Sequence, residues 1–474
     1  MKQTKKVTII VISLLLTIPL TMFSVYADNP DNNPNIRIIN IAQYPLFGGG
    51  CDHTVNIVFN YTWKANNTIY KFRCTALTLE EVAGGGEKPL NIENYDLLYV
   101  GVNYWSYIKD GLNKKLQNNI KKFLSEGGGY IGSCAGVTFA SQGFEKPKGV
   151  YQRATNRGVL GIADIYLNQD WFGELQYCMR SALSLPPIKL KVEKSDNPIF
   201  AEYKISHINL TYGGGAGLYE ADKSDSKLGK ITPLLKFDEE LMEIKPLHWY
   251  IKGLLPGWIP IKKVKTDLLG YHAAIATTYN NSGKIVLFSC HAEIPLAING
   301  TIKERFGKRP TYSSFGKLPR IVYEWNGTYI NMSHNWWLHR RAAAWIAGVP
   351  ESDLPPCNEL MVFMDKPQFR IGHQFYVNNT QLDLDKYIYR AAKKMVKEAG
   401  MTIIEGNITV EAYAENSDIV EFYLDGALEY TDSTRPFTWD LDNKLEGVHR
   451  LELRAYDEYG NFVCDGSEFF FVND

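Results

Sequence analysis

The amino-acid sequence predicts an α/β domain with a parallel sheet and helices on both faces, followed by a small β-sandwich. Between residues 36 and 136, apolar strands alternate with helical segments, which is the pattern of a parallel sheet covered by helices. From about residue 407, apolar and other residues alternate in short segments separated by turns, which is typical of a sandwich. The chain has 474 residues, and at about 150 residues per domain it can hold more than one domain.

The elements of the α/β part are predicted from the spacing of apolar residues. Leu112, Leu116, Ile120 and Leu124 fall at helical spacing, and the glycines at 127–129 end this helix. The predicted strands, which are apolar through their middles, are 36–41, 70–77, 96–101, 130–132, 273–279 and 284–289. The other predicted helices are 51–64, 336–347 and 385–398.

The composition describes a folded protein without a basic surface. Hydrophobic residues make up 45% and charged residues 22%, which are ordinary globular values. Lys and Arg number 51 against 52 Asp and Glu, so the net charge is −1. Because no excess of positive charge is present to bind phosphates, we exclude nucleic acid as a partner.

The N-terminal residues have the layout of a secretory signal peptide. Three lysines precede an apolar run that reaches about Leu20, and residues 25–27 supply small side chains for cleavage. We expect a signal peptide at 1–27, or alternatively an uncleaved anchor, and a linker at 28–35. No later stretch approaches the roughly 20 apolar residues of a membrane helix. We therefore expect an extracellular or cell-surface protein with no membrane span after cleavage.

The cysteines, histidines and sequons bear on the chemistry of the chain. Asn-x-Ser/Thr sequons recur, as at Asn60 and Asn209, and predict a glycoprotein if the host glycosylates exported chains. The seven cysteines include no Cys-x-x-Cys pair, which argues against zinc ribbons and thioredoxin-type sites. The nine histidines have no metal-ligand spacing. We expect neither a metal nor another cofactor.

The first candidate catalytic residue is Cys134. The sequence Gly-Ser-Cys-Ala-Gly at 132–136 lies where a predicted strand meets a helix, which is the setting of a nucleophile elbow. Thiolate is the reactive form of cysteine, and a helix N-terminus lowers the pKa of a thiol. The backbone N–H of Ala135 would face the developing oxyanion. The alternative interpretation is a buried cysteine in a tight turn.

The second candidate group follows the strand at 284–289. In the extended segment Cys290-His291-Ala292-Glu293, His291 and Glu293 project to the same side. Glu293 would accept a hydrogen bond from the imidazole, and His291 would take the proton from Cys134. The alternative is a structural histidine. The side chain of Cys290 is expected to point away from His291, into the core.

These residues resemble the class I glutamine amidotransferase-like superfamily. The run Gly-Gly-Gly-Tyr-Ile-Gly-Ser-Cys-Ala-Gly at 127–136 is most similar to the domain at the N-terminus of eukaryotic biotin–protein ligases. The resemblance implies a flavodoxin-like sheet, with Cys134 as nucleophile, His291 as base and Glu293 as orienting group. Nothing in the chain resembles a biotin ligase catalytic domain, so ligase activity is not implied.

The rest of the expected site lies in loops. Many relatives carry Pro-Gly-Gly after the third strand, where an amide completes the oxyanion hole. This chain has Gly-Val-Asn-Tyr-Trp at 101–105, and the amides of Asn103 or Tyr104 are the candidates. Glycine lets the backbone approach a ligand closely. Candidate substrate loops are therefore Gly49 with Gly50 and Gly214 with Gly215, the alternative being ordinary turns.

The tail resembles Ig-like modules of prokaryotic surface proteins, through Val-Glu-Phe-Tyr-Leu-Asp-Gly at 420–426 and Pro-Phe-Thr-Trp at 436–439. The expected organisation is a signal peptide (1–27), a linker (28–35), the amidotransferase-like domain (36–349), a connector (350–405) and the Ig-like sandwich (406–474). One hypothesis is an exported thiol hydrolase of a small-molecule, peptide or glycan amide. The other is a non-catalytic surface protein that binds a cell-surface partner and uses the tail as a spacer.

Overall fold

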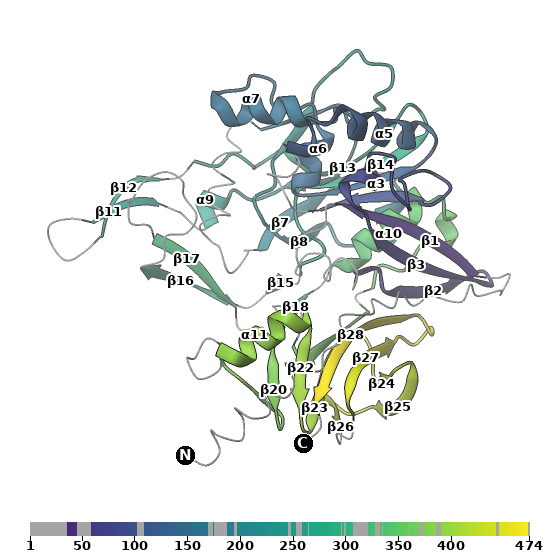
Figure 1. The fold of residues 1–474 in the computed structure, drawn as a ribbon. Helices are drawn as coiled ribbons and strands as arrows, with labels where there is room; N and C mark the ends of the chain where they lie inside the picture. Colours follow the sequence, from purple (N-terminus) through teal and green to yellow (C-terminus); the bar gives the residue numbers. More distant parts are fainter. Residues whose placement is uncertain are drawn as a thin grey trace. The chain divides into compact units, whose positions relative to one another are not determined.

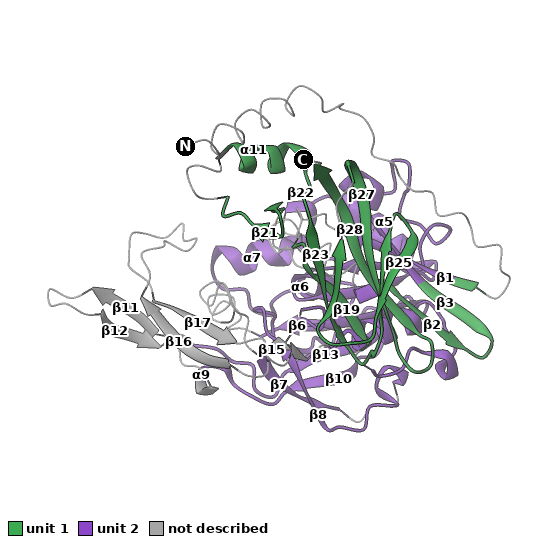
Figure 2. Cartoon of the chain, turned by 90° about the horizontal axis from the view of Figure 1, so that it is seen from below, with its two compact units in different colours: residues 1–37, 60–71, 360–474 green, residues 38–59, 72–359 purple. Residues whose placement is uncertain are grey.

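The computed structural model describes residues 36–44, 58–101, 109–168, 174, 187–193, 197–244, 248–252, 258–263, 265–294, 296–297, 300–306, 321–327, 332–333, 335–358, 360–368, 373–384, 390–441 and 445–472 (Figure 1). The predicted signal peptide and linker lie outside these residues. The chain forms two compact units: unit 1 comprises 1–37, 60–71 and 360–474, and unit 2 comprises 38–59 and 72–359 (Figure 2).

Unit 2 has a parallel core of four strands in a mixed sheet. β4 (Leu97–Val100) lies between β1 (Ile36–Tyr44) and β5 (Gly129–Ser133), and β5 also pairs with β14 (Gly283–Phe288). All of these pairings are parallel, and β4, β5 and β14 overlap the predicted strands at 96–101, 130–132 and 284–289. The carboxyl ends of β5 and β14 therefore lie side by side, which brings Cys134 and His291 to one edge of the sheet.

The sheet continues through antiparallel strands beyond β14. β13 (His272–Tyr279) pairs with β14 and with β10 (Thr232–Phe237), and β10 pairs with β7 (Pro187–Val192). Further strands are β8 (His207–Thr211), β9 (Leu218–Glu220) and β6 (Ile165–Leu167). Shorter strand pairs are β11 (His248–Lys252) with β12 (Trp258–Lys263), β15 (Leu296–Ala297) with β18 (Met332–Ser333), and β16 (Gly300–Phe306) with β17 (Ile321–Gly327). The α/β class is thus correct, with a mixed sheet around a parallel core.

Helices cover both faces of the parallel core. The apolar side of α5 (Lys114–Ser125) packs with Leu98 and Leu287 in one core cluster. α10 (Trp336–Ile346) instead contacts Tyr99 and Phe288, the next residues along the same strands. Because successive strand residues face opposite sides, these two helices lie on opposite faces. The other helices are α3 (Leu79–Val82), α6 (Ala135–Ala140), α7 (Gly149–Gly158), α9 (Leu241–Ile244), η1 (Pro198–Phe200) and η2 (Glu351–Asp353).

Unit 1 is built mainly from antiparallel strands. β27 (Gly447–Tyr456) pairs with β28 (Phe462–Val472) and with β24 (Val420–Leu424), which pairs with β25 (Ala427–Asp432). A second sheet contains β19 (Met361–Lys366), β23 (Ile408–Glu415) and β26 (Phe437–Leu441). On the other side of β28 lie β22 (Thr402–Glu405), β20 (Phe375–Val377) and β21 (Thr380–Gln381). The amphipathic helix α11 (Arg390–Ala399) lies within the predicted helical region 385–398, of which 385–389 fall outside the described residues.

The helix predicted over 51–64 is wrong from residue 61 onward, where the structure has a strand. Residues from Tyr61 form a hairpin of β2 (Tyr61–Ala65) and β3 (Thr68–Ala76), closed by Asn66 and Asn67 at φ 44° and 65°. Asparagine tolerates this left-handed conformation, which suits tight hairpin turns. Residues 60–71 belong to unit 1 through the pairing of Tyr61 with Val463, although they lie within the span predicted for the first domain. None of the helices within the described ranges combines the length and apolarity that a bilayer crossing requires.

Candidate active site

Cys134 occupies a strained turn between β5 and α6. Its backbone has φ 50° and ψ −103°, and its N–H donates to the carbonyl of Phe288 over 2.8 Å. The flanking glycines permit this turn: a Cβ on Gly136 would lie 2.0 Å from the carbonyl oxygen of Val100, and one on Gly132 would lie 2.8 Å from the carbonyl carbon of Gly136. A non-glycine residue with positive φ costs about 1–3 kcal/mol, and such strain concentrates at functional sites.

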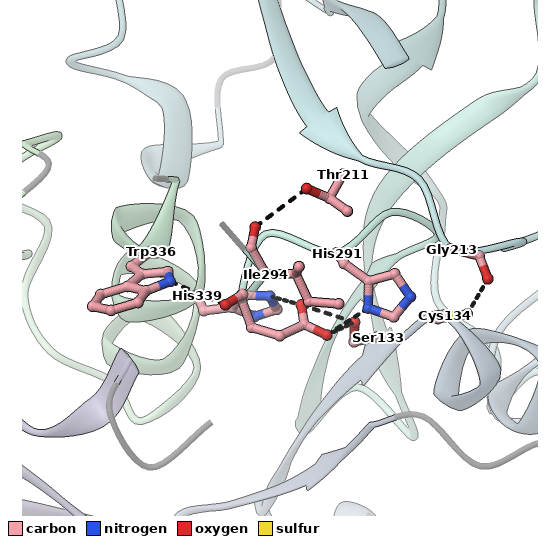
Figure 3. Close-up of polar contacts among 9 residues, drawn as sticks. Ser133, Cys134, Thr211, Gly213, His291, Ile294, Trp336 and His339 are labelled. Atoms are coloured by element: carbon pink, nitrogen blue, oxygen red, sulfur yellow. Dashed lines mark hydrogen bonds and ion pairs between the residues drawn. The ribbon is translucent and has the colours of Figure 1, made fainter. Parts of the chain in front are cut away.

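His291 is positioned by the backbone that follows β14. Its N–H donates to the carbonyl of Thr211 over 2.8 Å, which ties the segment to the end of β8. The ring Nδ1 lies 2.6 Å from Oε1 of Glu293, and both side chains are buried. Figure 3 shows the other ring nitrogen directed toward the side where Gly213 and Cys134 lie. The two residues that the sequence placed on one side of a strand are thus hydrogen-bonded.

Gly213 lies at the Nε2 side of the imidazole, opposite the nitrogen that bonds to Glu293. A Cβ at this position would lie 2.3 Å from Nε2 of His291, so only glycine leaves room for the ring. The thiol of Cys134 donates a weak hydrogen bond to the carbonyl of Gly213, with sulfur and oxygen 3.9 Å apart. The thiol of Cys134 and the imidazole of His291 therefore both lie beside Gly213.

Glu293 accepts hydrogen bonds from more than its expected partner. The hydroxyl of Ser133 lies 3.0 and 3.2 Å from its two carboxylate oxygens, and Nε2 of His339 lies 3.2 Å from Oε2. The indole N–H of Trp336 donates to the backbone carbonyl of Glu293 over 3.0 Å. Residues of both α10 and β5 thus donate hydrogen bonds to Glu293.

The charges of the site favour an ionised pair of His291 and Glu293. Burial opposes charge on His291, but the charges of Glu293 and Cys134 and hydrogen bonds to both raise the pKa of the imidazole well above its usual range. Burial opposes charge on Glu293 as well, yet the charge of His291 and hydrogen bonds from both histidines hold the pKa of the carboxyl well below its usual range. The cluster is therefore arranged to carry a proton on the imidazole.

The remaining cysteines differ from Cys134. Burial and the nearby charges of Cys134 and Glu293 raise the pKa of the Cys290 thiol well above its usual range, which disfavours the thiolate form of Cys290. Cys134 is free rather than disulfide-bonded, as are the other described cysteines: Cys74, Cys290, Cys357 and Cys464. Cys134 is 9% exposed against 1% for Cys290, which leaves it the more accessible thiol of the two.

The predicted loop residues divide into those that the structure places and those that it does not describe. Gly215 packs against the segment before His291, since a Cβ there would lie 1.8 Å from the carbonyl oxygen of Ser289, and Gly214 precedes it at φ 93°. Ala135 begins α6, where backbone N–H groups have no partner within the helix. The remaining candidates, Gly49, Gly50, Asn103 and Tyr104, lie outside the described residues.

Sequence reasoning missed Ser133, His339 and Trp336. Ser133 is part of the quoted motif, but only the fold shows that its hydroxyl reaches a carboxylate 160 positions away. His339 belongs to the predicted closing helix and is fully buried there. The signal in the sequence that could have indicated His339 was a histidine in a helix otherwise rich in tryptophan and alanine. Among the described residues, no group of three or more His, Cys, Asp or Glu side chains is arranged to hold a metal ion.

Comparison with known proteins supports the resemblance over part of the chain. A family model described as "Biotin-protein ligase, N terminal" matches residues 100–314, which include all three candidate catalytic residues. No protein with a curated function matches.

Solved structures with partial similarity include fibronectin(III)-like modules of Clostridium thermocellum CbhA, at 18% identity, covering 24% of this chain and 98% of that one, with a TM-score of 0.16. A lytic polysaccharide monooxygenase of Jonesia denitrificans matches at 17% identity over 15% of this chain and 57% of that one, with a TM-score of 0.14. A β-glucuronidase of Bacteroides uniformis matches at 15% identity over 33% of this chain and 14% of that one, with a TM-score of 0.17. TM-scores this low carry no argument about fold or function.

Proposed function

We propose that this chain is a glutamine amidotransferase-like thiol hydrolase that cleaves an amide or a related acyl bond. The observation that carries the proposal is the Cys134 elbow beside a buried His291–Glu293 pair, with His291 bonded to Glu293 over 2.6 Å. The family match over 100–314 supports a relationship to the biotin–protein ligase N-terminal domain. We further propose a flavodoxin-like layout for unit 2 and an Ig-like character for the tail, which would space the enzyme from a cell surface.

The reaction follows from the roles of the three side chains. The thiolate of Cys134 attacks the acyl carbon, and the carbonyl oxygen becomes an oxyanion beside the N–H of Ala135. The carbon–nitrogen bond breaks as protonated His291 gives its proton to the departing amine, which leaves a thioester on Cys134. Water then attacks the thioester while His291 accepts its proton, and collapse returns the acid and the thiol. Glu293 holds the ring orientation throughout.

Export to the extracellular space or cell surface is part of the proposal and rests on the N-terminal sequence alone. In that setting the substrate would be a small molecule, peptide or glycan that carries an amide. We propose that water accepts the acyl group from the thioester and that the amine or ammonia is released to solution.

Hydrolysis of a panel of amides tests the function. The full chain is incubated with glutamine and peptide amides, for which free ammonia is measured, and with acetylated amino sugars, for which free acetate is measured. We expect at least one substrate class to be hydrolysed by the native chain and not by Cys134→Ala. If intact-mass measurements find no acyl adduct and no substrate is cleaved, the chain is better described as the non-catalytic binding protein.

A further inference from the structure

We propose that His339 is a positioning residue, which holds the second carboxylate oxygen of Glu293 so that the first faces His291. The inference rests on the proposed function and adds a fourth side chain to the expected three. His339 does not touch Cys134 in any described contact. Its action runs entirely through the carboxylate.

The two imidazoles bind opposite oxygens of one carboxylate. Nδ1 of His291 lies 2.6 Å from Oε1, and Nε2 of His339 lies 3.2 Å from Oε2. His291 comes from the segment after β14 and His339 from α10, so two separate elements set the plane of the carboxylate. A carboxylate fixed at both oxygens cannot rotate away from His291 without breaking a buried hydrogen bond, which costs about 1–3 kcal/mol.

Among the described residues, the only hydrogen bond of the His339 side chain is the one to Glu293. The side chain is 0% exposed, and its ring packs edge-on against Tyr99 and Phe288, with centroids 5.6 and 5.0 Å away. Its Nδ1 has no hydrogen-bond partner among the residues that the structure describes. Adding a proton there would bury an N–H without an acceptor among aromatic rings. We infer that Nε2 carries the proton that is donated to Oε2 of Glu293.

An apolar residue would fill the same space without an unpaired nitrogen. Burying a polar ring with a single partner is unfavourable relative to a hydrocarbon of equal size. The buried imidazole is therefore explained by the hydrogen bond that it donates to the carboxylate of Glu293. Ser133 donates to the same group and supports the same orientation from β5.

Other charged groups near His339 point to different partners. On its own helix, Nε of Arg340 donates to the carbonyl of Val58, and Nε of Arg341 donates to the carbonyl of Ile199. The titratable groups that face the cluster from the packed strands are Tyr99 on β4, Cys134 after β5 and Cys290 after β14. The test below changes none of these groups.

The experiment measures labelling of Cys134 by iodoacetamide across pH, with rates from peptide mass spectrometry on the full chain. The matched variants are His339→Gln, whose amide N–H can replace the Nε2 donor, and His339→Met, which has similar volume and no donor. We expect His339→Met to label roughly tenfold more slowly near pH 6.5, with the rise in rate moved to higher pH, because the loosened carboxylate supports the imidazolium less well. His339→Gln should stay within about threefold of the native rate.

A second background shows whether the effect passes through Glu293. In Glu293→Gln, adding His339→Met should change the labelling rate no further, because the carboxylate it acts on is gone. The inference would be overturned if His339→Met and His339→Gln slowed labelling equally. It would also be overturned if His339→Met slowed labelling as much in the Glu293→Gln background as in the native chain. If His339→Met does not fold by circular dichroism, His339→Asn replaces it, since its amide is one carbon too short to reach Oε2.

The proposed function fails in a different arm of the same experiment. Native Cys134 that labels like an ordinary thiol and ignores His291→Ala refutes the thiol hydrolase, and the inference with it. If the labelling rate of Cys134 falls in His291→Ala but does not change when the donor at position 339 is removed, only the inference about His339 is refuted.

Discussion

At the scale of single residues, the chemistry depends on one carboxylate that is shared by several donors. Glu293 is buried, and it accepts from His291, Ser133 and His339. A buried charge is tolerated only when it is paired and hydrogen-bonded, so each donor keeps Glu293 ionised. The sequence could indicate His291 and Glu293 because they lie two positions apart. It could not indicate His339, which lies 46 positions from Glu293 and meets it only after α10 has packed on the sheet.

The ionised pair predicts a pH-dependent loss of stability in Glu293→Gln. The pKa of Glu293 is lowered by folding, so its contribution is present above its unfolded pKa of about 4.3 and is lost as pH falls. The pKa of His291 is raised, so its contribution is present below about 6.5 and is lost as pH rises. We expect a deficit of about 3 kcal/mol in the free energy of unfolding near pH 5.5 and a smaller one near pH 9.

Urea denaturation of the native chain and Glu293→Gln at both pH values measures this deficit. The control is Glu202→Gln, which removes a carboxylate that pairs with Arg341 but is 57% exposed, and which should cost little at either pH. A Glu293→Gln deficit that is constant, or that grows toward alkaline pH, contradicts the ionised pair.

At the scale of elements, the site is made where strands end. Cys134 follows β5, His291 follows β14, and the loop that contacts both follows β8. The strand β14 and the helix α5 could be predicted from an apolar run and from helical spacing, and the short strand β5 from its place between the glycines at 127–129 and the Gly-Ser-Cys-Ala-Gly motif. The second strand of the hairpin at 61–76 could be predicted, as 70–77, but its first strand, β2, could not, because β2 pairs with β28 at the other end of the chain.

The loop after β8 predicts that Gly213→Ala disables the site. The added Cβ would lie 2.3 Å from Nε2 of His291, so the ring must leave its present position. We expect slow iodoacetamide labelling of Cys134 and a destabilisation of about 1–3 kcal/mol. Gly229→Ala is the matched control, because its Cβ would meet Oγ1 of Thr278 at 2.2 Å, on β13. Equal labelling rates in the two variants would show that Gly213 does not constrain His291.

At the scale of the whole molecule, the chain folds as two units with their own buried cores. Unit 1 gathers the hairpin at 60–71 with residues 360–474, so two distant parts of the chain complete one sheet. Unit 2 contains every described residue of the candidate active site. The change in residue pattern near 407 predicts a separate C-terminal domain, whereas unit 1 takes up the chain from Leu360 and includes residues expected to be a connector. The assignment of residues 60–71 could not be predicted, because strand pairing over 400 positions leaves no local signal.

This division predicts that unit 1 can be weakened without changing the site. Trp63 is 1% exposed and stacks between Tyr61 and Tyr70, with centroids 5.8 and 5.0 Å away. Trp63→Ala should therefore destabilise unit 1 by about 3–5 kcal/mol. Below its unfolding transition, Cys134 should label at the native rate. Slower labelling in the folded variant would show that the site depends on unit 1.

The most direct test of the account is the rate at which iodoacetamide labels Cys134 in the native chain and in His291→Ala, near pH 6.5. The account predicts that native Cys134 reacts at least about tenfold faster than glutathione, and that His291→Ala removes this advantage, because the imidazole no longer holds the proton of the thiol. A native rate equal to that of glutathione, with no change in His291→Ala, would contradict the proposal that Cys134 is an activated nucleophile.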